Sequence, residues 1–310
     1  MKNLIKKILS TRHILKLSKD NRFIFVFHDV SDQDSPQYSK HYSTPIKTFK
    51  AQVNFLNTLF EIIPLEEIVT NKNLDIKKNY AAITFDDGFK SVLQNADPIL
   101  TKLNIPYTVF LNSSALESNQ IWVSNIEIFK KDDTYITKLL QLSHTSLGEG
   151  EDPITAIVNR GKFSTEFRSN YRKANADIKI YMDKEDIALL LKKNVGIENH
   201  SYDHFVLSST LPEELKRQIK DNHLLIHSIT GKNSKHFAIP FGKKEHFNKT
   251  TISELRSEGY NFIYTTNPNR FQTEDLSDEH FLFPRIGVTS ETPEQLQFYI
   301  NRAIIKTYQL

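Results

Sequence analysis

The feature that most constrains the fold is a repeated alternation between short apolar runs and amphipathic helical patterns. Seven runs have the length and composition of buried strands, over residues 23–27, 81–85, 107–111, 195–197, 237–239, 262–264 and 281–283. The helical patterns are clearest over residues 45–60 and 212–230, each with a proline at its first position. Strands that alternate with helices predict a parallel sheet. Seven of them favour a closed α/β barrel.

One stretch, at about residues 112–181, interrupts this alternation and is interpreted as a large insertion. It follows the strand that ends at Leu111. Since barrel enzymes form their active sites from the loops at the carboxyl ends of strands, we expect the insertion to wall a substrate groove. The single tryptophan, Trp122, lies in it. It is either a platform that stacks on a sugar ring or, as is commoner for a lone tryptophan, a packing residue.

Composition excludes several classes of site. The chain has 310 residues, of which 39% are hydrophobic and 25% charged, as in an ordinary globular protein. Its net charge is only +3 and its lysines and arginines are scattered, so we expect no nucleic-acid partner. It has no cysteine, which excludes disulfides and thiolate metal sites. Any metal must therefore be held by histidine, aspartate or glutamate.

The first twenty residues form a basic amphipathic pattern that precedes the domain expected over residues 21–310. Lys6, Lys7 and Arg12 interrupt their apolar content, so we expect neither a cleaved export signal nor a membrane span. Two interpretations stay open: the segment contacts an anionic membrane surface, or it packs on its own domain. We expect a cytoplasmic protein, peripheral at the inner membrane face if the first interpretation holds.

Two adjacent carboxylates follow the second strand-like run, in the sequence AAITFDDGF over residues 81–89. Successive side chains of a strand point to opposite sides, so Asp86 and Asp87 can have different roles. One can bind a metal while the other acts as a base on water, and Gly88 lets the backbone turn. By itself, an Asp-Asp-Gly sequence is equally compatible with an ordinary loop in which aspartate caps a helix.

A histidine pair and a turn follow two later runs. His200 and His204 are four residues apart, so one turn of chain can bring both imidazoles to one point. Two histidines and one carboxylate are a known catalytic metal set. Pro240 and Gly242 end the run at 237–239 in a rigid turn, where the backbone N–H of Phe241 is a candidate oxyanion donor.

Together these segments resemble the polysaccharide deacetylase family, the NodB-homology domain of carbohydrate esterase family 4. The family motifs are Thr-Phe-Asp-Asp-Gly, His-Ser/Thr-x-x-His and Arg-x-Pro-Tyr/Phe-Gly; they stand here as Thr84-Phe-Asp-Asp-Gly88, His200-Ser-Tyr-Asp-His204 and Ala238-Ile-Pro-Phe-Gly242. The resemblance implies a distorted (β/α)7 barrel that uses a divalent metal, most often Zn²⁺. It also implies that Asp86 is the catalytic base and that Asp87, His200 and His204 are the metal ligands.

The chain departs from the family pattern at two places. The arginine expected to orient the base is replaced by Ala238, and no late Leu-x-His motif supplies the general acid. The early sequence FVFHDV, residues 25–30, resembles circularly permuted members, which makes His28 the expected acid. Arg285, at the end of the last run, is a candidate partner for Asp86 from another side of the barrel.

The resemblance implies hydrolysis of N-acetyl groups on amino sugars of a glycan or a glycan precursor. An O-acetyl esterase on the same scaffold is the nearest alternative, because an alcohol leaves more easily than an amine. A catalytically silent carbohydrate-binding domain is the second alternative, suggested by Ala238. The presence of all four residues Asp86, Asp87, His200 and His204 argues against a catalytically silent domain, since an inactive site would lose its costly buried charges first.

Overall fold

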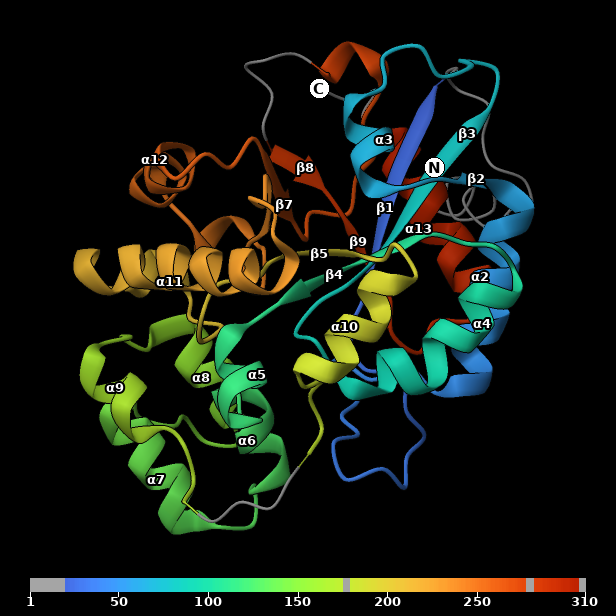
Figure 1. The fold of residues 1–310 in the computed structure, drawn as a ribbon. Coiled ribbons are helices and arrows are strands. Elements are labelled where there is room, and N and C mark those ends of the chain that lie inside the picture. Colours follow the sequence, from blue (N-terminus) through green and yellow to red (C-terminus); the bar gives the residue numbers. More distant parts are fainter. Residues whose placement is uncertain (1–19, 175–178, 277–281, 307–310) are drawn as a thin grey trace.

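The computed structural model describes residues 20–306 apart from 175–178 and 277–281 (Figure 1). The basic segment expected at 1–20 therefore lies outside the described residues except for Asp20. Within the described ranges, no helix combines the length and apolar character that crossing a membrane requires.

A parallel sheet forms the centre of the molecule. Its strands run in the order β8, β7, β6, β5, β4, β3, β1, β9, with β2 (Glu61–Ile62) paired to β3. Their bounds are β1 (Asn21–Phe27), β3 (Asn79–Phe85), β4 (Tyr107–Leu111), β5 (Gly196–Asn199), β6 (His236–Ala238), β7 (Phe262–Thr265), β8 (Leu282–Pro284) and β9 (Ile286–Gly287). Only Arg285 separates β8 from β9, and β9 pairs with β1, so the sheet curls into a nearly closed barrel. The expected distorted (β/α)7 barrel is confirmed.

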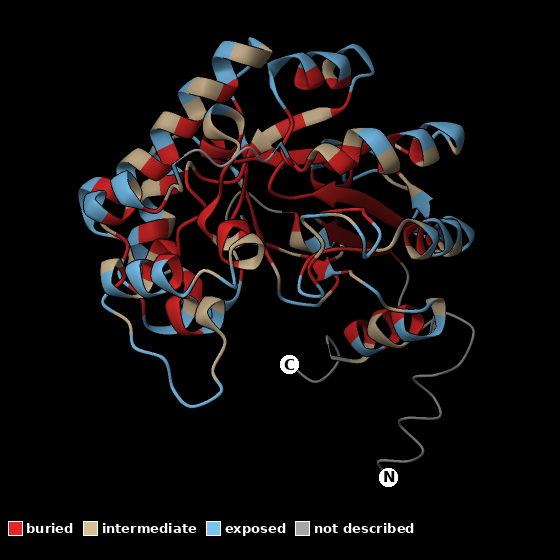
Figure 2. Cartoon of the chain, turned by 90° about the horizontal axis from the view of Figure 1, so that it is seen from below, coloured by how far each residue is buried: buried red, intermediate tan, exposed pale blue. Residues whose placement is uncertain are grey.

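The two faces of the strands have separate apolar contacts. Phe23, Phe25 and Phe27 of β1 belong to the outer core, which includes Phe49 of α2 (Ile46–Leu59). Alternate positions belong to a second cluster inside the barrel, which includes Ile24, Ala82, Phe110, Ala238, Tyr264 and Phe283. Both faces of β1 are therefore buried, as in other parallel sheets, and Figure 2 shows central strands buried beneath helices with exposed outer faces.

Helices cover the outside of the barrel. These are α2, α3 (Leu65–Thr70), η1 (Val92–Ala96), α4 (Asp97–Lys102), α10 (Lys184–Lys192), α11 (Pro212–Thr230), α12 (Lys249–Ser257) and α13 (Pro293–Lys306), with single turns η2 (Leu207–Ser209), η3 (Lys244–His246) and η4 (Thr273–Asp275). The helix predicted at 212–230 is confirmed to the residue. The helix predicted at 45–60 begins one residue later, because Pro45 has an extended ψ of 139° and occupies the cap position.

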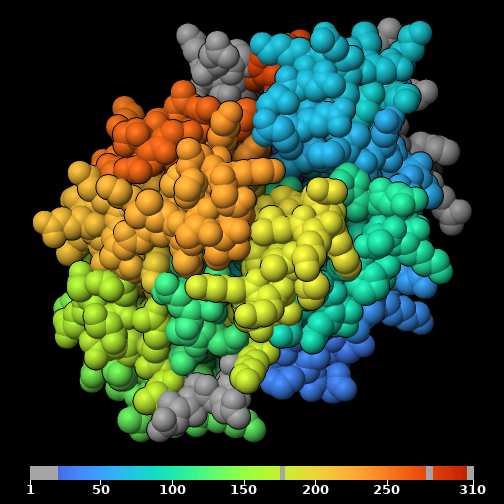
Figure 3. Space-filling view, in the orientation of Figure 1, coloured from blue at the N-terminus to red at the C-terminus, as the bar shows by residue number. Residues whose placement is uncertain are grey.

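The long connection between β4 and β5 is mostly helical. It contains α5 (Ser113–Ser118), α6 (Trp122–Ile128), α7 (Asp133–Leu142), α8 (Pro153–Arg160) and α9 (Thr165–Asn170), which form the green lobe below α11 in Figures 1 and 3. Trp122 is fully buried against Phe163 and Phe167, and its Nε1 donates to the carbonyl oxygen of His204 at 3.0 Å. The sugar-stacking interpretation of Trp122 is therefore wrong, because no face of its ring reaches solvent.

Candidate active site

Four of the predicted site residues lie on the inner side of the barrel at the carboxyl ends of its strands. His28, Asp86 and Arg285 follow the inward-facing residues Ile24, Ala82 and Phe283 by an even number of positions. His200 is two residues beyond Glu198, which pairs in register with the inward-facing Phe110. Because side chains alternate along a strand, these four converge on one rim of the barrel.

Asp86 and Arg285 form a buried bidentate ion pair. Arg285 donates through Nη1 to Oδ1 of Asp86 at 2.8 Å and through Nη2 to Oδ2 at 2.7 Å. The side chains are 0% and 2% exposed. Burial alone would raise the pKa of Asp86, but Arg285, followed by His200 and His28, lowers it well below its ordinary value. Asp86 is therefore a carboxylate at neutral pH, held in a fixed orientation.

The same arrangement explains how the barrel accommodates alanine where the family motif has arginine. The guanidinium of Arg285 lies over the rings of Phe110 and Tyr264, with centroid distances of 5.4 and 6.0 Å. Ala238 belongs to the same inner cluster as these two rings. The cation thus approaches Asp86 from the β8–β9 segment instead of from the end of β6, as we expected from the sequence.

Asp87, His200 and His204 form a buried group whose candidate ligand atoms all lie within 4.8 Å of one another. Nε2 of His200 is 3.5 Å and Nε2 of His204 is 3.3 Å from Oδ1 of Asp87. Nδ1 of His200 bonds the carbonyl oxygen of Ala238 at 2.8 Å, which leaves Nε2 as the free ring nitrogen. Oδ1 of Asp87 and Nε2 of His200 are buried without a hydrogen-bond partner among the described residues. Three converging ligand residues of this type, two of them with a buried and unpartnered ligand atom, fit a divalent metal such as Zn²⁺.

The protonation states of this group follow from its burial. Burial lowers the pKa of His200 and lowers the pKa of His204 still further, so both imidazoles are neutral, the form that binds metal. Burial, and then repulsion by Asp86, raises the pKa of Asp87 well above its ordinary value. A cation placed between these residues would offset that desolvation, which is the usual reason for retaining a carboxylate in such a position.

Several residues of the two loops have left-handed backbone. Asp87 has φ 71° and Gly88 has φ 77°, and a Cβ on Gly88 would meet Cδ2 of Leu111 at 2.6 Å. In the loop over residues 200–204, which we call the histidine loop, Ser201 has φ 66° and His204 has φ 57°. The Oγ of Ser201 accepts from the backbone N–H of His204 at 3.1 Å, so the loop is closed by its own side chain.

Asp203, which we did not single out from the sequence, anchors this loop to the rest of the protein. Its buried carboxylate accepts from the Tyr171 hydroxyl at 3.1 Å and from Nε2 of Gln218 at 2.8 Å, and it pairs with Arg217. Its backbone N–H donates to Oε1 of Gln218 at 2.7 Å. In the sequence, only its position inside the His-x-x-x-His segment could have indicated a role for Asp203. Its hydrogen-bond partners lie far from it in the sequence, so no local pattern reveals them.

His28 lies at the rim, as predicted, and lines the cavity together with Asp86 and Asp87. Its Nδ1 is buried without a hydrogen-bond partner in the described part of the chain. Burial lowers the pKa of His28 to about 4, opposed by the negative charge of Asp86 and reinforced by His200 and Arg285. The ring is therefore neutral at neutral pH until additional negative charge develops beside it.

Four of the predicted residues, His28, Asp86, Asp87 and His204, line a cavity of about 370 Å³, whereas His200 and Arg285 are not among its lining residues. Phe241 also lines it, with φ 61° and its ring packed edge-on against His204 at a centroid distance of 4.6 Å. The connection between β4 and β5 contributes one wall through α6 and α8. Sequence reasoning missed further lining residues outside the motifs, among them His41, Tyr42, Lys243, His246 and Thr266.

Comparison with known proteins identifies relatives of this chain. The family model described as "Polysaccharide deacetylase" matches residues 73–263. YxkH of Bacillus subtilis (strain 168), for which polysaccharide deacetylation is the expected activity, is 19% identical over 248 residues; the match covers 79% of this chain and 64% of YxkH.

Two solved structures have the same fold. The deacetylase PplD of Streptococcus pyogenes, in complex with acetate, is 15% identical with a TM-score of 0.62, and the match covers 91% of this chain and 99% of that one. IcaB from Ammonifex degensii is 16% identical with a TM-score of 0.60, covering 93% and 99%. At these identities the two structures establish the likeness of the fold alone.

Proposed function

Because this chain belongs to the polysaccharide deacetylase family, we propose that it is a metal-dependent hydrolase that removes N-acetyl groups from amino sugars of a glycan. The observation that carries the proposal is the arrangement of two chemically different groups side by side at one rim of the barrel. Asp86 is an ionised carboxylate fixed by Arg285, whereas Asp87, His200 and His204 form the buried group of candidate metal ligands beside it.

The reaction needs a base, an electrophilic aid and an acid, because an acetamide is a poor electrophile and its amine a poor leaving group. Asp87, His200 and His204 would hold the divalent metal, most often Zn²⁺ in this family. When bound, such an ion polarises a carbonyl and makes water more acidic. Asp86, whose Oδ2 is 3.6 Å from Nε2 of His200, borders that position and would take the proton as water attacks the acetyl carbon.

His28 would complete the reaction from the rim. The tetrahedral species would carry negative charge, which favours protonation of a neighbouring imidazole and would so raise the low pKa of His28. His28 would then give a proton to the nitrogen as the C–N bond breaks, leaving acetate and a free amine. The backbone N–H of Phe241 remains the candidate donor to the oxyanion.

The test measures both products. Purified protein loaded with Zn²⁺ would be incubated with N-acetylated amino-sugar oligomers that differ in linkage and, separately, with an O-acetylated glycan, and acetate and free amine would be quantified together. We expect equal amounts of the two products, and none from the Asp86→Asn variant. Acetate without amine, released from an O-acetylated glycan only, would instead identify an esterase. Binding of glycan without release of acetate from either substrate would identify a silent domain.

A further inference from the structure

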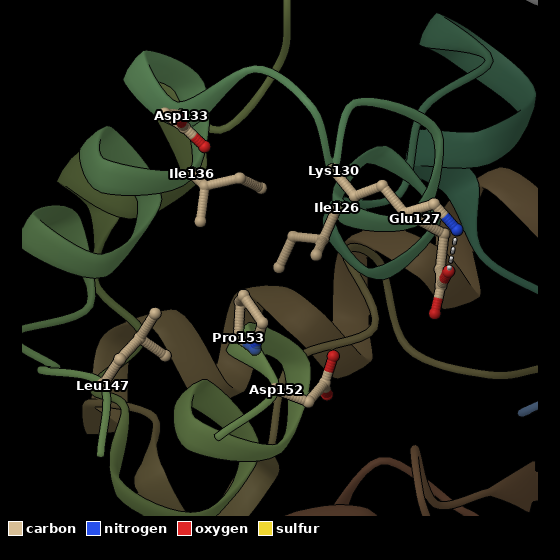
Figure 4. A pocket seen from close by; sticks show the side chains of 8 residues that line it. All are labelled: Ile126, Glu127, Lys130, Asp133, Ile136, Leu147, Asp152 and Pro153. Atoms are coloured by element: carbon tan, nitrogen blue, oxygen red, sulfur yellow. Dashed lines mark ion pairs between the residues drawn. The ribbon is translucent and has the colours of Figure 1, made fainter. Parts of the chain in front are cut away.

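A second cavity, of about 220 Å³, lies within the insertion beside the reaction cavity (Figure 4). Four apolar side chains surround it, and in Figure 4 they point toward one another across the space: Ile126, Ile136, Leu147 and Pro153. Four charged residues, Glu127, Lys130, Asp133 and Asp152, complete its lining. We call this space the insertion cavity.

The insertion cavity adjoins the reaction cavity at one shared residue, Asp152, which lines both of them. Helix α8, which Asp152 caps by accepting from the N–H of Thr155 at 2.9 Å, supplies further residues to the reaction cavity. A second connection runs through His41, which lines the reaction cavity and lies 3.9 Å from Oε1 of Glu127. A chain-like ligand that leaves the reaction cavity on this side therefore meets the insertion cavity next.

The size and lining of the insertion cavity indicate what it can hold. Its volume is below the roughly 300 to 1,000 Å³ of pockets that enclose a whole drug-sized ligand, so it suits one unit of a longer molecule. An apolar surface with polar groups at its edge matches a pyranose ring, which has apolar C–H faces and hydroxyls around its edge. Three carboxylates and one ammonium give the lining an excess of negative charge, which disfavours an anionic sugar.

We propose that the insertion cavity is a subsite for a neutral or amine-bearing sugar unit of the same glycan whose N-acetyl group is hydrolysed in the reaction cavity. This inference rests on the proposed function. It makes the protein selective for oligomers long enough to fill both cavities. The insertion thus sets chain-length preference, while the barrel supplies the hydrolytic groups.

The experiment compares substrate lengths in a wild-type and a blocked protein. The probes are N-acetylglucosamine and its oligomers of two to six units, in the linkage that the wild-type enzyme hydrolyses best. Leu147, 42% exposed, is replaced by arginine, whose guanidinium can reach the nearby carboxylates and cover the apolar surface. Leu189→Arg on α10 is the matched control, since Leu189 is 48% exposed and lines neither cavity.

We expect kcat/KM of the wild type to rise with length until the insertion cavity is filled. Leu147→Arg should reduce the ratio of kcat/KM between the longest oligomer and the monosaccharide by about 5- to 10-fold, mainly through KM, which corresponds to about 1 to 1.4 kcal/mol. Leu189→Arg should keep the wild-type ratio. Thermal midpoints of the three proteins check that the substitutions are folded.

The outcomes separate this inference from the proposed function. If the wild type releases acetate equally well from every length, or if Leu147→Arg keeps the wild-type ratio, the subsite is refuted while the deacetylase stands. If no length is hydrolysed with Zn²⁺ present, the proposed function itself fails. Competition completes the test: fully deacetylated glucosamine oligomers should inhibit the wild type more strongly than uronic-acid oligomers of equal length, and the reverse order would refute the charge argument.

Discussion

Replacement of Arg285 by methionine is the sharpest test of the base assignment. Methionine keeps much of the side-chain volume and removes the cation, so Asp86 is left as a buried carboxylate without its two hydrogen bonds. Since both side chains are at most 2% exposed, solvent cannot replace the lost partner. Breaking a buried pair in this way costs about 3 to 5 kcal/mol of unfolding free energy.

The effect on turnover is separate from the effect on stability. Without Arg285, Asp86 loses the charge that opposes its desolvation and the contacts that fix its orientation. A single general base contributes about 10² to 10⁴ in rate. We therefore expect Arg285→Met to lower deacetylation by at least about 10²-fold, with metal content unchanged, because the hydrogen bonds of the Arg285 guanidinium go to Asp86 and Thr84 and not to the three candidate ligands.

A double-mutant cycle decides whether the pair acts as a unit. Asp86→Asn combined with Arg285→Met removes both buried charges, so it should be more stable than Arg285→Met alone while remaining inactive. Urea denaturation measures the stability of each preparation, and acetate release measures its activity. Lys78→Met, which breaks the exposed Lys78–Glu61 pair, is the control and should change neither. An Arg285→Met protein that is as stable and as active as the wild type would refute the reasoning.

The remaining predictions concern the metal, the acid and the N-terminal segment. Asp87→Asn should lose Zn²⁺ whereas Asp86→Asn should keep it and lose turnover, as measured by metal analysis of both purified variants; equal loss in both would mean that the roles are misassigned. His28→Ala should slow hydrolysis of an N-acetyl sugar by about 10² to 10⁴-fold but hardly affect an activated acetyl ester, because only the amine must be protonated to leave; equal slowing of both would exclude His28 as the acid. If residues 1–20 bind anionic lipid, the full chain should sediment with anionic liposomes at low salt and a chain that starts at Asn21 should not.

Much of the barrel could be predicted because strand character is local. Each of the seven apolar runs overlaps an observed strand, although Phe281 of the last run lies outside the described residues. The connection between β4 and β5 was recognised only as a break in the pattern. Its helices pack mainly on one another and on the histidine loop, as the burial of Trp122 shows, and such mutual packing has no simple period in the sequence.

The sequence by itself determined that the site residues follow apolar runs and therefore stand at the ends of strands. Alternation along a strand is a property of the backbone, so neighbouring residues there point to opposite sides. The same reasoning separates Asp86 from Asp87. These features depend on a few neighbouring residues and need no knowledge of the closed fold.

Only the tertiary structure decided which of these residues meet. Arg285 reaches Asp86 across 199 positions of sequence because β9 pairs with β1 and so brings the last strand beside the first. Asp203 likewise contacts Tyr171 and Arg217 of α11 because the fold brings these separate segments together. Contacts of this length depend on the register and closure of the whole sheet, which is set by all the strand pairs together and is not a property of any single segment.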